Sequence, residues 1–148
     1  MFKEFKDALL QMKEGIVAEV SKITNVKFLE AAIGGCVIVA AADKVLKSEE
    51  KAKMMKFVKT NESLKHFDSD TAVDLFNKYA KALEFDFDFG LEEIYAVIRK
   101  FKGKDEARIL VRLYCTIGAS DGDFDADEKQ AVRNICKELA LDPADFGL

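Results

Sequence analysis

The sequence has little of several residue types, and each shortage excludes a class of protein. One proline and eight glycines among 148 residues are too few for the many tight turns of a strand-rich fold. The single histidine, His66, cannot supply the several imidazole ligands that a zinc enzyme typically uses. The longest apolar run covers residues 31–42, well short of the roughly 20 residues that a bilayer span requires. These shortages predict a helical protein that does not cross a membrane.

Charge and cysteine usage narrow the class further. The 27 acidic residues outnumber the 23 basic ones, giving a net charge of −4. Nucleic acid is therefore not expected as a partner, because phosphate binding depends on clustered positive charge. The cysteines are odd in number and form no C-x-x-C motif, so we expect reduced thiols packed in the core: Cys36, Cys115 and Cys136. The first residues mix both signs of charge and contain no signal-peptide core, which predicts a cytoplasmic protein.

Apolar residues recur every three or four positions along most of the chain. This period predicts about seven helices, including helices over 2–20, 48–59 and 91–101, and then a short C-terminal turn. The segment 27–42 is apolar all round, which is typical of a central buried helix. Phenylalanines alternate with acidic residues over 84–90, but a lone strand there has no pairing partner, so we predict a tight corner between helices. The fold class expected for residues 1–148 is therefore a single all-α domain.

An internal repeat relates two parts of the chain at a constant offset of 78 residues. Each part contains an apolar helix, a small residue, an aspartate, a loop, an acidic pair, a lysine and a second apolar helix. The repeat covers about 27–60 and 105–140, and its identities are Ala41 with Ala119, Asp43 with Asp121, Glu50 with Glu128, and Lys51 with Lys129. We therefore predict two pseudo-symmetric helical halves related by a pseudo-two-fold axis.

The second copy of the repeat contains a very acidic turn. Residues 121–128 hold five acids in eight positions, and this much negative charge destabilises a turn unless something neutralises it. Carboxylates at alternate loop positions are the hard oxygen ligands that suit Ca²⁺, or Mg²⁺ with retained waters. The EF-hand spacing does not fit, because Ala126 and Val132 stand where its glycine and glutamate are required. A cation site here would need ligands from both copies of the repeat.

Helix capping is the alternative explanation for part of this acidic turn. Asp125 is suited to the N-cap of the following helix, with Glu128 three residues later completing a capping box. Carboxylates in a first helical turn are also stabilised by the helix dipole. Capping leaves Asp121, Asp123 and the matching Asp43 without a role.

Four motifs resemble the TerB family of bacterial tellurite-resistance (Ter) stress-response proteins, and the similarity extends over nearly the whole chain. They are SEEKAKM at 48–54, FDFD at 85–88, ASDGDFDADEK at 119–129 and LDPADFGL at 141–148. The resemblance implies an all-helical fold of two related halves and an acidic cluster that holds divalent cations. It also implies action beside other Ter-system proteins, including a membrane-embedded one, at the cytoplasmic face of the membrane and without catalysis.

Carried over to this sequence, the resemblance implies a metal site and a cofactor, a divalent cation that we expect to be Ca²⁺, with Mg²⁺ as the alternative. Its ligands fall on Asp43, Glu50, Asp121, Asp123 and Glu128. The first turn has Lys44 where the family favours glycine after the aspartate, and this positive charge is expected to weaken that half of the site.

The favoured function is a non-enzymatic, cation-binding scaffold or sensor in a tellurite-resistance system. The alternative is a metal-independent adaptor whose acidic end docks a basic partner. An enzymatic role ranks last, since the sequence specifies no substrate pocket. Lysines and arginines also gather over 51–59 and 99–104; these are usually solvated helix faces, and the alternative is a patch for anionic lipid or an acidic partner.

Overall fold

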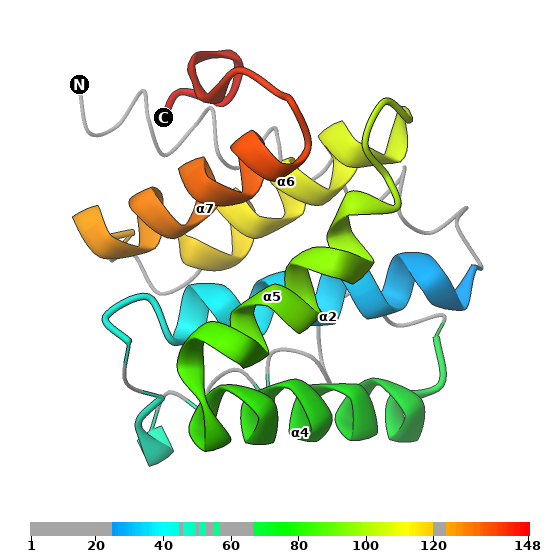
Figure 1. Cartoon of the computed structure of the whole chain (residues 1–148), viewed down its shortest axis with the longest axis vertical. Coiled ribbons are helices and arrows are strands. Elements are labelled where there is room, and N and C mark those ends of the chain that lie inside the picture. The colour runs from blue at the N-terminus through cyan, green and yellow to red at the C-terminus, as the bar shows by residue number, and fades with distance from the viewer. Residues whose placement is uncertain (1–24, 45, 50, 53–54, 57–66, 120–123) are drawn as a thin grey trace.

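The computed structural model describes residues 25–44, 46–49, 51–52, 55–56, 67–119 and 124–148 (Figure 1). Regular structure in these ranges is entirely helical, which confirms the predicted all-α class. The elements are α2 (Val26–Ala40), α4 (Ser69–Phe85), α5 (Phe87–Arg99), α6 (Glu106–Gly118), α7 (Ala126–Glu138) and the 3₁₀ helix η2 (Pro143–Phe146). The count of seven helices is not confirmed: five α-helices lie in the described ranges, and the helix predicted over 2–20 and part of that over 48–59 fall outside them.

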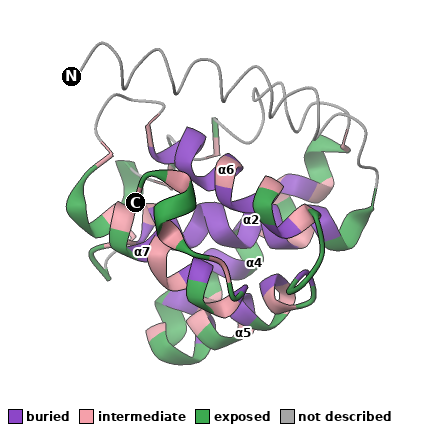
Figure 2. Cartoon of the chain, turned by 90° about the horizontal axis from the view of Figure 1, so that it is seen from above, coloured by how far each residue is buried: buried purple, intermediate pink, exposed green. Residues whose placement is uncertain are grey.

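Helix α2 lies at the centre of the fold, as its apolar sequence predicts. It contacts α4 and α5 on one side and α6 and α7 on the other (Figure 1). Eleven of its fifteen residues are buried, and Figure 2 shows this helix enclosed by the others. Its N-terminus is capped by Asn25, whose side chain accepts a hydrogen bond from the amide of Lys27. A helix buried on all faces holds the two helix pairs together through one core.

Small residues on α2 allow α6 to approach closely. A Cβ atom added at Gly35 would lie 2.1 Å from the Tyr114 ring, so only glycine fits there. The Tyr114 hydroxyl donates a buried hydrogen bond to the carbonyl of Ala31, with 2.6 Å between the oxygens. Ring packing and hydrogen bond together fix the position of α6 along α2.

The corner predicted over 84–90 is confirmed, and it consists of a single residue. Asp86 is both the C-cap of α4 and the N-cap of α5. Helix α5 therefore begins at Phe87, four residues earlier than predicted, because the Asp86 carboxylate caps it there by accepting a hydrogen bond from the Phe89 amide. It also ends at Arg99, two residues before the predicted end.

Within the described ranges, no helix is long and apolar enough to cross a lipid bilayer.

Candidate functional site

The helices that flank the two acidic turns follow the 78-residue offset of the repeat. Helix α2 ends at Ala40 and α6 at Gly118, and the equivalent residues Ala41 and Ala119 are their C-caps. Helical residues resume at equivalent positions too, at 48 and 126. The two turns thus connect helices with matching boundaries, whereas the pseudo-two-fold packing of the two halves stays a prediction.

The first turn places Asp43 on the surface, directly after α2. The next residue, Lys44, has φ 69°, in the left-handed region that favours glycine. Its amide donates a 2.8 Å hydrogen bond to the carbonyl of Ala41, which closes the turn. The lysine that departs from the family pattern therefore occupies a backbone conformation for which glycine is the better residue.

The second turn is anchored by Phe124, which is partly buried against the core. A Cβ at Gly118 would lie 2.6 Å from the Phe124 ring, so the absent side chain makes room for the aromatic one. The ammonium of Lys129 lies 5.8 Å from the centroid of the same ring. In the first turn Leu46, the repeat equivalent of Phe124, is likewise packed against the core. Each turn therefore has a large apolar side chain that packs against the helices.

The predicted capping box at the start of α7 is present. The Asp125 carboxylate accepts a 2.8 Å hydrogen bond from the Glu128 amide, and the Glu128 carboxylate accepts a 3.3 Å bond from the Asp125 amide. Capping thus uses one oxygen of each of these side chains. A carboxylate that caps a helix is also a hard oxygen donor, so the capping box is compatible with Glu128 in the predicted ligand set.

The structure describes two of the five predicted metal ligands, Asp43 and Glu128. Asp43 is exposed and Glu128 is partly buried, and both are hard oxygen donors of the type that Ca²⁺ and Mg²⁺ take. Glu50, Asp121 and Asp123 lie outside the described residues. No group of three or more histidine, cysteine, aspartate or glutamate residues that could hold a metal occurs in the described part of the chain. The full set of five ligands thus stays a prediction. The two described residues, Asp43 and Glu128, are carboxylates of the kind that the predicted cations bind.

The three cysteines are buried free thiols, as predicted. Burial raises the pKa of Cys115 to about 12 and that of Cys136 to about 11, and it also raises the pKa of Cys36. All three are therefore protonated near neutral pH. Because the thiolate is the reactive and ligating form, these residues are suited to packing rather than to binding a soft oxyanion.

The basic cluster predicted over 99–104 is smaller than its sequence suggests. The Nε of Arg99 lies 2.7 Å from the carboxylate of Glu138, and its Nη1 lies 2.7 Å from that of Glu92. The pair with Glu138 joins α5 to α7, whereas the pair with Glu92 lies within α5. The hydrogen bond from Arg99 lowers the pKa of Glu92. The guanidinium of Arg99 is therefore already neutralised by carboxylates.

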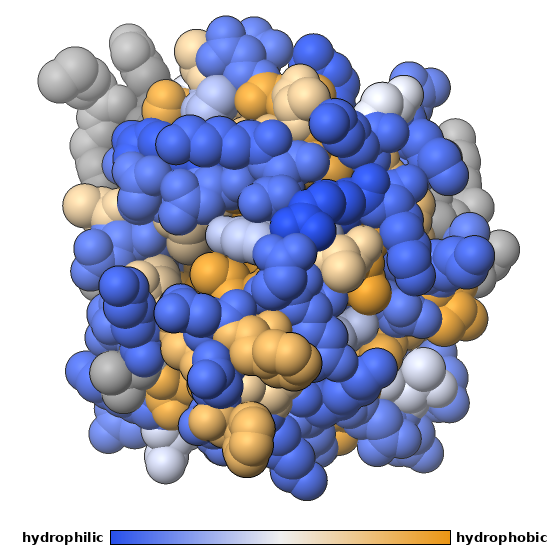
Figure 3. All heavy atoms as spheres, viewed as in Figure 1, coloured by the Kyte–Doolittle hydropathy of each residue, from blue (hydrophilic) through white to orange (hydrophobic). Residues whose placement is uncertain are grey.

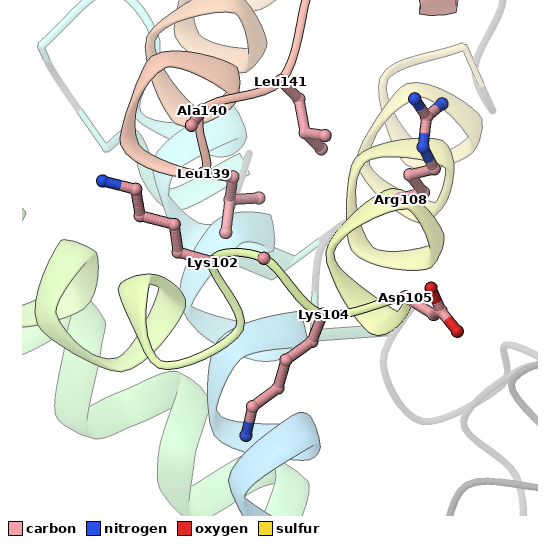
Figure 4. A pocket seen from close by; sticks show the side chains of 8 residues that line it. Lys102, Lys104, Asp105, Arg108, Leu139, Ala140 and Leu141 are labelled. Atoms are coloured by element: carbon pink, nitrogen blue, oxygen red, sulfur yellow. The ribbon is translucent and has the colours of Figure 1, made fainter.

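A cavity of about 310 Å³ adjoins this cluster, between the α5–α6 turn and the end of α7. Figure 4 shows the side chains of Lys102, Lys104 and Arg108 extending from its rim in three different directions. Arg108 pairs with Asp145 at 3.4 Å, and the ammonium of Lys104 lies 5.7 Å from the centroid of the Phe101 ring. These cations do not converge on one point, so the cavity lacks the geometry of an anion site.

Phe85 and Phe89 at the α4–α5 corner are exposed to solvent, a surface feature that was not predicted from the sequence. The available signal was the alternation of these aromatic residues with acids. Such alternation outside a strand places some of the aromatic side chains in solvent.

Comparison with known proteins identifies the family. The model of the family described as "Tellurite resistance protein TerB" matches residues 29–148. A tellurium resistance protein TerB from Alcaligenes sp. is 33% identical over 106 residues, which cover 72% of this chain and 87% of the relative. No solved structure gives a significant match. The chain therefore belongs to the TerB family of tellurite resistance proteins.

Proposed function

We propose that this TerB protein is a non-enzymatic scaffold or sensor that binds a divalent cation with its two acidic turns. Carboxylates from both copies of the repeat hold the cation, which we take to be Ca²⁺, and so link the two helical halves. The ligands are Asp43, Glu50, Asp121, Asp123 and Glu128. When bound, the cation supplies positive charge that offsets the repulsion among these carboxylates.

The proposal depends on one observation: helix capping explains only some of the acidic residues in the two turns. The capping box accounts for Asp125 and for one oxygen of Glu128. The capping motif does not include Asp121, Asp123 or Asp43, and Asp43 stands in the first copy of the repeat where Asp121 stands in the second. Family membership and the matching helix boundaries around the two turns also support a cation site shared by the two turns.

Titration of the ¹⁵N-labelled full chain with CaCl₂ and, separately, MgCl₂ tests the proposal. We expect amide NMR signals from 41–46 and 119–129 to shift together and to saturate at the same ion concentration. Asp121→Asn combined with Asp123→Asn should abolish the shifts in both turns. Asp127→Asn is the matched control, because Asp127 is an exposed acid of the same region outside the proposed ligand set. Shifts confined to one turn, or none at millimolar ion, would contradict a shared site.

We also propose that the protein acts with other Ter-system proteins at the cytoplasmic face of the membrane. Family membership supports this, and no helix in the described ranges could itself insert as a span. Cation binding would set the relative position of the two halves and so the surface offered to a partner. The wild-type chain should retain a membrane-embedded Ter protein in the presence of Ca²⁺ and release it on chelation. Retention that chelator leaves unchanged would favour the metal-independent adaptor.

A further inference from the structure

The α4–α5 corner is held rigidly by its backbone. The Asp86 amide donates a 3.2 Å hydrogen bond to the carbonyl of Ala82, and its carboxylate accepts a 2.9 Å bond from the amide of Phe89. A Cβ at Gly90 would lie 2.6 Å from backbone atoms of Ala82 and Leu83, so the start of α5 lies directly against the end of α4. Side chains at this corner are therefore presented from a fixed frame.

Two phenylalanines of this rigid corner are exposed to solvent. Phe85 is 90% exposed and Phe89 is 70% exposed, whereas Phe87 between them is partly buried against the core. Figure 3 shows hydrophobic side chains gathered on the surface near the junction of α4 and α5, with hydrophilic ones around them. Exposed aromatic residues on a rigid frame are typical of an interaction surface, because they bury large apolar area on binding with little loss of conformational freedom.

The surroundings of these two rings carry negative charge. Residues 82–98 contain five acids and no lysine or arginine. Glu84 forms an ion pair with Lys51, and Glu92 pairs with Arg99. Asp86 and Asp88 are exposed and lie between the two phenylalanines in the sequence. A partner that fits must therefore supply apolar side chains together with positive charge.

We propose that Phe85 and Phe89 form a docking surface for a protein segment that carries apolar side chains flanked by lysine or arginine. The apolar side chains of the partner cover the two phenyl rings, and its cations approach the carboxylates of Asp86 and Asp88. An anionic membrane surface is the wrong occupant, since these carboxylates would be repelled by its headgroups. Phe85, Phe89, Asp86 and Asp88 are not among the proposed cation ligands, so the inference does not depend on cation binding.

Binding of a synthetic amphipathic leucine–lysine peptide to the full chain tests this proposal. We expect saturable binding in fluorescence anisotropy, with amide NMR shifts concentrated at 84–92. Phe85→Ser combined with Phe89→Ser should weaken binding at least about tenfold, as truncation of central aromatic anchors does. Both rings are exposed, so the circular dichroism of this variant should remain that of the wild type. Val26→Ser is the matched control, because Val26 is 53% exposed and lies outside the corner.

Three further binding experiments test whether the partner must carry positive charge and be a peptide rather than a membrane. Asp88→Lys should weaken binding of the lysine peptide, and it provides a second test that keeps both rings. A peptide with glutamate in place of lysine should bind far more weakly. Phosphatidylcholine vesicles with phosphatidylserine should not bind. Equal binding by the double phenylalanine variant, shifts confined to 119–129, preference for vesicles, or no peptide binding at about 1 mM would each overturn the proposal.

Discussion

Replacement of Gly35 by alanine tests the close approach of α2 and α6. The added Cβ would lie 2.1 Å from two ring carbons of Tyr114 and 2.5 Å from its hydroxyl oxygen. Carbon atoms in contact prefer about 3.5–4.0 Å, so the ring or α6 must move by more than an ångström. Tyr114 is fully buried and its hydroxyl is hydrogen-bonded to Ala31, so the ring has no free direction in which to move.

The expected cost follows from three terms. Overpacking of a well-packed core costs about 1–3 kcal/mol. Loss of the Tyr114 hydrogen bond adds about 0.5–1.5 kcal/mol. Alanine favours the helix by up to about 1 kcal/mol relative to glycine, which offsets part of this. We therefore expect Gly35→Ala to lower the free energy of unfolding by about 2–3 kcal/mol, corresponding to a fall in Tm of roughly 4–12 °C.

Urea unfolding followed by circular dichroism measures this loss. Gly34→Ala is the comparison variant, because its nearest neighbour is the single Cγ2 methyl of Ile94 at 2.7 Å, a smaller overlap than that with the Tyr114 ring at 2.1 Å. That variant should lose clearly less stability. Combining Gly35→Ala with Tyr114→Leu should cost less than the sum of the single changes, since the smaller side chain removes the clash. A Gly35→Ala protein as stable as wild type would refute the packing argument.

Three other predictions concern the turns and the ion pairs. Lys44→Gly should raise the free energy of unfolding by about 0.5–1 kcal/mol, because it relieves the left-handed strain at φ 69° at some entropic cost; Lys44→Ala should not. Asp125→Ala should lower it by about 1 kcal/mol in chemical denaturation through loss of the capping box, and Asp125→Asn by less. Arg99 lowers the pKa of Glu92 in the folded state. The ion pair therefore stabilises the folded protein fully at pH values above 4.5, the ordinary pKa of glutamate, and this stabilisation is lost as pH falls through the lowered pKa. NMR titration of Glu92 should show this low value, and Arg99→Gln should return it toward 4.5.

Helix periodicity and composition predicted those parts of the fold that depend on burial alone. The apolar faces of α2 mark it as the central helix, and the lack of a pairing partner rules out a strand over 84–90. The start of α5 at Phe87 was not predicted. The reason is that the Asp86 cap sets the start of the helix, whereas the apolar period used for the prediction begins at Leu91. The alternation of phenylalanines with acids indicates that some of these rings are exposed, but which ones are exposed depends on how α4 and α5 meet.

In the candidate metal site, too, local features were predictable from the sequence and long-range packing was not. The capping box was predictable because it depends on residues only three positions apart. The left-handed conformation of Lys44 could be anticipated only through the family preference for glycine at that position. Whether carboxylates of the two turns meet depends on the packing of segments 78 residues apart, and sequence spacing does not specify this.

Thermal unfolding with and without Ca²⁺ tests most directly whether the two acidic turns share a cation. At a free ion concentration about a hundredfold above Kd, binding to the folded state alone adds about 2.7 kcal/mol. For a chain of this size we expect Tm to rise by about 8 °C. The single change Asp43→Asn should remove this rise in Tm, and so should the double change Asp121→Ala with Glu128→Ala. The control Asp127→Asn should show the same rise as the wild type. An unchanged Tm with any divalent ion at millimolar concentration, or a full rise in the Asp121→Ala/Glu128→Ala variant, would contradict the shared site.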